Sequence, residues 1–190
     1  MWAFIVKKTA IPREKQGGYK YWRGADVLEF TSHGYDGYVF DENGTKIDFK
    51  GYRADCINDF ALEYINNHEN KKPFFMFVSQ LEPHHQNDHG HFEGPKESVE
   101  KYRDYPIPED LSFLDGDYKE EYPDYIAAIN RLDENVGKLV NTLKEKEFMI
   151  TRLLFTQATT VVILKPEILN INAVATNQVY ILPLYSVAVL

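Results

Sequence analysis

Histidine is concentrated in one short segment of this sequence. Four of the six histidines lie between Glu82 and His91, in the run Glu-Pro-His-His-Gln-Asn-Asp-His-Gly-His. An imidazole can donate a hydrogen bond to an anionic oxygen, transfer a proton or bind a metal. The alternative is that this histidine-rich segment is a solvated polar loop without a function. We rank a metal site below anion binding because no second ligand set with a recognisable spacing appears elsewhere; its ligands would be His84, His85, His89 and His91.

The segment before these histidines is typical of a buried strand. Residues 74–79 are a short, mostly apolar run that follows a polar stretch, as expected for a central strand covered on both faces. In an open α/β sheet, ligands bind beyond the carboxyl ends of the strands. The position of the histidines directly after this strand therefore favours a functional role over a solvated loop.

Two amphipathic helices flank the strand in the sequence. Asp55 has the position of the N-cap of the first helix. Apolar residues then recur on one helical face, at Ile57, Phe60, Ala61, Tyr64 and Ile65. This pattern stops after residue 65, so the helix should end near His68. A long ordered loop is expected from Ser98 to Tyr118. The spacing after it predicts a second helix, with Tyr125, Ile126, Ile129, Leu132, Val136, Leu139, Val140 and Leu143 on its apolar face. This order of elements indicates the α/β class.

The composition limits the possible partners. A chain of 190 residues with 44% apolar content can bury one core, so a single globular domain is expected. The net charge of −8 disfavours nucleic acid and an anionic membrane as partners. The lone Cys56 excludes an internal disulfide framework. Met1 to Thr9 has its apolar residues before its lysines, the reverse of a secretory signal. The compartment stays unknown, and it is cytoplasmic if the start is genuine.

The composition changes abruptly after Phe148. Gly, Asp and His are frequent up to this residue and absent from 149–190. The tail is rich in Val, Ile, Leu and Thr but has none of the Gly-containing turns that separate strands. We expect residues 153–164 to occupy a strand position all the same, because a buried strand needs mainly apolar, β-branched side chains.

The stretch from about Ile11 to Phe148 resembles the sulfatases of the alkaline-phosphatase-like superfamily. The resemblance rests on short motifs in the family's order: Gly-Tyr-Arg-Ala-Asp (51–55), the helix through Asp59 and Ile65, Lys-Pro-Phe-Phe (72–75), Glu-Pro-His (82–84) and Leu-Asp-Glu-Asn-Val-Gly (132–137). It implies a partial alkaline-phosphatase-like fold, with helices packed on a mainly parallel sheet. Residues 1–148 would then be part of the N-terminal catalytic domain.

The resemblance also implies a specific chemistry. Sulfatases hydrolyse sulfate esters with a formylglycine made from the Cys of a Cys-x-Pro-Ser-Arg motif, beside a bound calcium. Cys56 is followed by Ile57 and cannot be that residue, and the paired N-terminal metal aspartates are missing. The fragment should therefore be inactive alone and should not bind calcium. Of the family's pocket residues, His84 matches the catalytic, sulfate-contacting histidine, and His85 and Asn87 would extend the pocket. The intact enzyme would act on a small-molecule or carbohydrate sulfate ester.

The tail fits the same family in another reading frame. After its last helix, a sulfatase continues with Asp-Asn-Thr, a hydrophobic strand and Ser-Asp-His-Gly, which binds the metal. Suppose that each codon of the true frame consists of the third base of one codon of this sequence and the first two bases of the next, starting at Met149. The degenerate genetic code then permits Asp-Asn-Thr-Ile-Val-Val, and further along it permits Tyr-Thr-Ser-Asp-His-Gly. We interpret residues 149–190 as a frameshifted continuation of the same domain.

Two other functions remain open at the level of sequence. A phosphoester or phosphonate hydrolase of the same superfamily would share the fold and a similar metal, and would differ in using a Thr or Ser nucleophile. A non-enzymatic protein that binds a metal or a partner through its histidine-rich loop is the alternative from another class. The sequence does not indicate the substrate or the oligomeric state.

Overall fold

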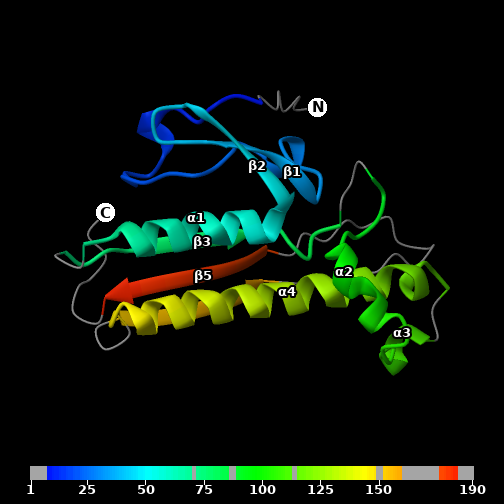
Figure 1. Cartoon of the computed structure of the whole chain (residues 1–190). Coiled ribbons are helices and arrows are strands. Elements are labelled where there is room, and N and C mark those ends of the chain that lie inside the picture. Colours follow the sequence, from blue (N-terminus) through cyan, green and yellow to red (C-terminus); the bar gives the residue numbers. More distant parts are fainter. Residues whose placement is uncertain are drawn as a thin grey trace.

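Two long helices lie side by side against a sheet in the computed structural model (Figure 1), which describes residues 8–69, 72–85, 89–112, 115–148, 152–159 and 176–183. Helix α1 is Arg53–Asn67 and helix α4 is Tyr118–Glu145. They pack on a three-stranded sheet, and a two-stranded hairpin packs on α1. The arrangement confirms the α/β class.

The hairpin runs directly into α1. It consists of β1 (Tyr35–Phe40) and β2 (Lys46–Tyr52), which pair antiparallel. The Asp41 carboxylate closes the turn by accepting hydrogen bonds from the backbone N–H groups of Asn43 (2.9 Å) and Thr45 (2.7 Å). Because β2 ends at residue 52 and α1 begins at residue 53, no loop separates the hairpin from the helix. Its buried residues contact α1 in a cluster formed by Val39, Phe49 and Cys56.

Helix α1 begins before the predicted N-cap. Tyr52 is the N-cap and makes no side-chain capping bond, and Asp55 lies within the first turn. The Asp55 carboxylate instead accepts hydrogen bonds from α4, from Asn135 Nδ2 (2.8 Å) and Arg131 Nη1 (3.2 Å). The prediction of Asp55 as a cap was wrong because its partners come from a helix far away in the sequence. The predicted end near His68 is confirmed.

The main core lies between α1, α4 and strand β3 (Met76–Gln80). Leu139 and Leu143 of α4 meet Ile65 of α1 over Met76 of the strand, and all four side chains are buried. Helix α4 confirms the second predicted helix but begins earlier, at Tyr118. No helix among the described residues combines the length and apolar character needed to cross a bilayer.

Strand β3 lies at the edge of the sheet that the described strands form, and not at its centre as predicted. The strand order is β3–β5–β4, where β4 is Arg152–Thr159 and β5 is Thr176–Pro183. The burial of β3 alternates along the strand, and Phe77 is 38% exposed. The prediction of coverage on both faces was therefore wrong, since among the described residues the helices cover only the face that carries Met76 and Val78.

The pairing direction of this sheet also differs from the mainly parallel sheet that was predicted. Both β3 and β4 pair antiparallel with β5. Two strands that are antiparallel to the same neighbour run in the same direction, so β3, α4 and β4 retain the direction of a βαβ unit. The sequence pattern located β4, which overlaps the expected 153–164 region, but could not show that β5 lies between it and β3.

Short helices interrupt the connection from β3 to α4, where the sequence predicted a long loop. They are α2 (Lys96–Val99), η3 (Glu100–Tyr102) and α3 (Glu109–Ser112). The connection packs on the start of α4 through a second buried cluster, formed by Phe92, Tyr118 and Tyr122. Two further 3-10 turns, η1 (Arg13–Lys15) and η2 (Leu28–Phe30), precede the hairpin.

Candidate functional site

A buried ion pair fixes the segment that follows β3. The Nε atom of Arg53 lies 2.8 Å from Oε1 of Glu82, and the two side chains are 0% and 2% exposed. The Arg53 guanidinium also donates to the carbonyl of Ser32 (2.8 Å), and the Arg53 backbone N–H donates to the carbonyl of Gly34 (2.8 Å). These contacts join the start of α1 and the residues before the hairpin to the end of β3. They hold in place the backbone that carries the histidines.

His84 is buried beside a carboxylate. Its Nε2 atom lies 3.4 Å from Oε2 of Glu29, which belongs to η2, and its backbone N–H donates to the carbonyl of Leu81 (3.1 Å). A carboxylate beside an imidazole orients the ring. Glu29 was not predicted as a partner of this histidine, because nothing in the sequence links residue 29 to residue 84. The role of His84 in sulfate contact stays a prediction.

The next histidine, His85, contacts an aromatic ring. Its ring packs edge-on against Phe92, with centroids 5.2 Å apart, and its Nε2 atom has no hydrogen-bond partner among the described residues. A buried ring nitrogen of this kind can serve a polar ligand. Asn87, the third predicted contact, lies outside the described residues.

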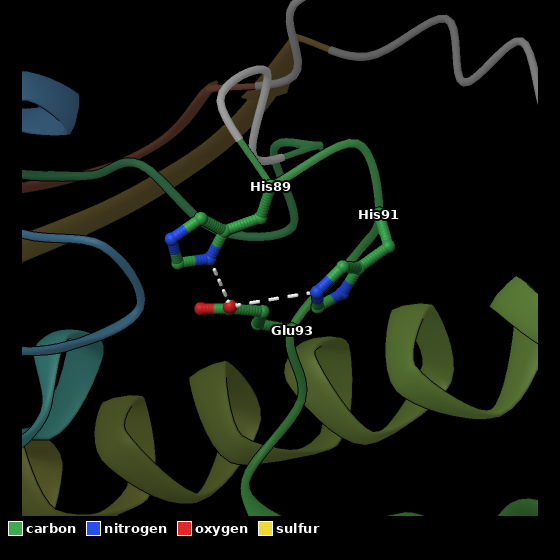
Figure 2. Close-up of side chains that lie close together, drawn as sticks. All are labelled: His89, His91 and Glu93. Carbon is green, nitrogen blue, oxygen red and sulfur yellow. Dashed lines mark hydrogen bonds and ion pairs between the residues drawn. The ribbon is translucent and has the colours of Figure 1, made fainter.

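The other two histidines of the segment meet a glutamate, as Figure 2 shows. The Nδ1 atom of His89 lies 2.5 Å from Oε1 of Glu93, and the Nε2 atom of His91 lies 3.8 Å from the same oxygen. One ligand atom from each residue lies within 4.8 Å of the others. The metal set considered in the sequence analysis is thus divided: His89 and His91 come together, whereas His84 contacts Glu29. Glu93 was missed, although its i, i+2, i+4 spacing with the histidines is that of one side of an extended chain.

Two carboxylates of α4 fix the backbone next to this group. Glu121 accepts a hydrogen bond from the backbone N–H of Phe92 (2.6 Å), and Asp124 accepts one from Gly94 (2.9 Å). Burial raises the pKa of both carboxyl groups, although these hydrogen bonds and the nearby His91 lower it in part. Both acids therefore lie in a partly desolvated position behind the histidine-rich segment.

Comparison with known families identifies the origin of this scaffold. The model of the sulfatase family matches residues 3–156 of the chain, which is more than half of its length. The chain belongs to the sulfatase family. Sulfatases generally use a metal ion in their reaction. No curated protein matches the chain in sequence.

Solved sulfatase structures share the fold. One, from Bacteroides thetaiotaomicron and solved in work on the metabolism of multiple glycosaminoglycans, has a TM-score of 0.67 at 18% identity, over 89% of this chain and 37% of that one. The proposed sulfatase yidJ from Bacteroides fragilis has a TM-score of 0.67 at 19% identity, over 90% of this chain and 40% of that one. This chain thus spans about two fifths of their length. Another solved structure, in complex with its substrate D-glucosamine-2-N,6-O-disulfate, has a TM-score of 0.45 at 15% identity, over 90% of this chain and 50% of that one, and a likeness this low does not show the fold.

The sulfatase motifs recognised in the sequence contact one another in space. Arg53 of the first motif binds Glu82 of the Glu-Pro-His motif, and Asp55 of the first motif binds Asn135 of the motif at 132–137. Tyr52 and Leu132 also share a buried cluster. Motifs far apart in the sequence therefore form one connected unit around the start of α1.

Proposed function

We propose that this sulfatase-family chain supplies part of the sulfate-binding wall of a sulfuric ester hydrolase, with His84 as the catalytic-site residue that contacts sulfate. The observation that supports the proposal most directly is the Arg53–Glu82 ion pair. It joins two family motifs and fixes the backbone two residues before His84. His85 and Asn87 extend the wall. An imidazole N–H donates a hydrogen bond to a sulfate oxygen more strongly when the negative charge increases, as it does in the transition state.

Glu29 would act on this histidine as a positioning residue. Its carboxylate lies 3.4 Å from Nε2 of His84, and both side chains are largely buried, 12% and 5% exposed. Because Nε2 faces this carboxylate, a hydrogen bond from His84 to a sulfate oxygen would come from the other ring nitrogen, Nδ1. We therefore propose that Glu29 fixes the orientation of the ring and does not itself contact the anion.

The chain alone is proposed to be inactive. Its only cysteine, Cys56, is not in a formylglycine motif, and burial raises its pKa to about 11, which leaves little nucleophilic thiolate at neutral pH. Among the described residues, the calcium of the family also lacks a fitting site. The group formed by His89, His91 and Glu93 offers two nitrogens and one carboxylate, whereas calcium takes six to eight oxygen ligands. No step of the reaction is assigned to calcium in this chain.

The domain assignment follows from the same proposal. Residues 1–148 are part of the catalytic domain, and 149–190 are its frameshifted continuation. The intact enzyme would take a small-molecule or carbohydrate sulfate ester. Neither nucleic acid nor a membrane is proposed as a partner.

Two experiments test this function. The purified chain, incubated with an aryl sulfate such as 4-methylumbelliferyl sulfate, should release no more product than buffer; clear turnover would contradict the account of the nucleophile. The gene should be sequenced across codon 148. An adjacent frame that encodes Ser-Asp-His-Gly supports the frameshift, and the lack of such a frame contradicts it.

A further inference from the structure

We propose that His89, His91 and Glu93 form a binding site for a divalent transition metal such as zinc. The three side chains face one another in Figure 2, and their potential ligand atoms all lie within 4.8 Å. In a tetrahedral zinc site with bonds of about 2.0–2.2 Å, ligand atoms are roughly 3.3 Å apart. The distances from Glu93 Oε1, 2.5 Å to His89 and 3.8 Å to His91, lie on either side of that value. Metal binding would therefore need the carboxylate oxygen to move away from His89 and closer to His91.

The backbone that carries Glu93 is already fixed. Tyr52 donates its hydroxyl hydrogen to the carbonyl of Glu93 (2.9 Å). The N–H groups on either side, at Phe92 and Gly94, donate to carboxylates of α4. A ligand held on a fixed backbone loses little conformational freedom when the metal binds, and this favours affinity.

Gly34 makes room for the carboxylate. A Cβ atom at this position would lie 1.7 Å from Oε2 of Glu93, so any side chain there would displace the glutamate. Oε2 is itself buried and has no hydrogen-bond donor among the described residues. A buried carboxylate oxygen without a donor is costly, and a bound cation would offset that cost.

The histidines lie closer to solvent than the glutamate. The side chains of His89 and His91 are 39% and 48% exposed, against 16% for Glu93. The two rings stack with centroids 5.9 Å apart, and His33 lies against His89 at 5.3 Å. The metal would thus enter from the solvent side, and water would occupy the fourth position.

The ligand types select the metal. Two imidazoles and one carboxylate suit zinc and its neighbours among the divalent transition metals, whereas calcium and magnesium favour oxygen ligands. The site uses neither His84 nor His85. It is therefore separate from the proposed sulfate contact, and either proposal can fail without the other.

Isothermal titration calorimetry of the whole chain with zinc chloride tests the site, with cobalt(II) absorption as a second readout of coordination. We expect saturable one-to-one binding that equimolar calcium does not compete with. His91→Ala and Glu93→Gln should each weaken it by at least about tenfold. The matched control is His68→Ala, because His68 lies at the far end of α1.

Circular dichroism would show that each variant is folded. Because His91 is half-exposed, His91→Ala should leave the fold intact, so a loss of binding in it reports on the ligand. Absence of saturable zinc binding to the unmodified chain would overturn the proposal. Binding that survives both ligand substitutions, or that is lost in His68→Ala, would overturn it as well.

Discussion

Arg53 and Glu82 form a fully buried ion pair, with Nε and Oε1 2.8 Å apart. The arginine begins α1, and the glutamate follows β3 just before the histidines. The second guanidinium contact, to the carbonyl of Ser32, extends the link to the residues before the hairpin. The pair therefore connects three parts of the fold at the point where the candidate site begins.

Breaking this pair should destabilise the protein strongly. In Glu82→Gln the guanidinium of Arg53 remains buried without its counter-charge, and we expect the free energy of unfolding to fall by about 3–5 kcal/mol in urea denaturation. The double variant Arg53→Met with Glu82→Leu should recover much of that loss, because no charge then stays buried. The exposed pair of Lys46 and Asp48 offers a control, and Asp48→Asn should leave the midpoint unchanged. An equally small effect in Glu82→Gln would contradict this account.

The contact between α1 and α4 predicts a second effect on stability. Asn135 is 2% exposed and donates to Asp55, so Asn135→Ala should lower the free energy of unfolding by roughly 1–3 kcal/mol, since it leaves a carboxylate oxygen without its donor. Asn141→Ala is the matched control, as Asn141 is an exposed asparagine of the same helix. If the two variants unfold at the same urea concentration, the Asp55 contact does not stabilise the helix pair.

Cys56 should react slowly in the folded protein. Its thiol donates to the carbonyl of Lys50, and burial, with the nearby Asp59 and Asp55, raises its pKa to about 11. At pH 8 we expect alkylation by iodoacetamide to be roughly two orders of magnitude slower than in urea, where the thiol has its ordinary pKa. Mass spectrometry at timed intervals measures both rates. Equal rates in the two conditions would show that the thiol is accessible in the native state.

Asp124 should make stability depend on pH. Burial raises its pKa above the ordinary value of 3.8, so the folded state binds this proton more tightly than the unfolded state. The contribution is fully present below pH 3.8 and is lost as the pH rises through the folded pKa. Asp124→Asn stays neutral and can still accept from the N–H of Gly94. Urea denaturation from pH 3.5 to 7 should therefore show the variant gaining stability relative to the unmodified chain as the pH rises; a difference that is constant with pH, or that falls, would contradict the assignment.

The sequence by itself determined the order of α1, β3 and α4 and the family, whereas the hairpin of β1 and β2 was not predicted. Apolar periodicity located α1, α4 and β3, and the ordered motifs identified a sulfatase, because local spacing and residue type are properties of the chain alone. The histidine-rich segment was found for the same reason. Its position after β3 could be predicted, since the apolar run that forms the strand directly precedes the histidines in the sequence.

The tertiary structure alone decided which residues meet. The pairs of Arg53 with Glu82, and of His84 with Glu29, join positions between which no periodicity exists. The antiparallel insertion of β5 depends on pairing that an apolar run does not specify, because any strand of suitable length can pair in either direction. Glu93 became a candidate ligand only when the fold turned its carboxylate toward His89 and His91. Side-chain chemistry was thus readable from the sequence, whereas the distances that give it a function arose from long-range packing.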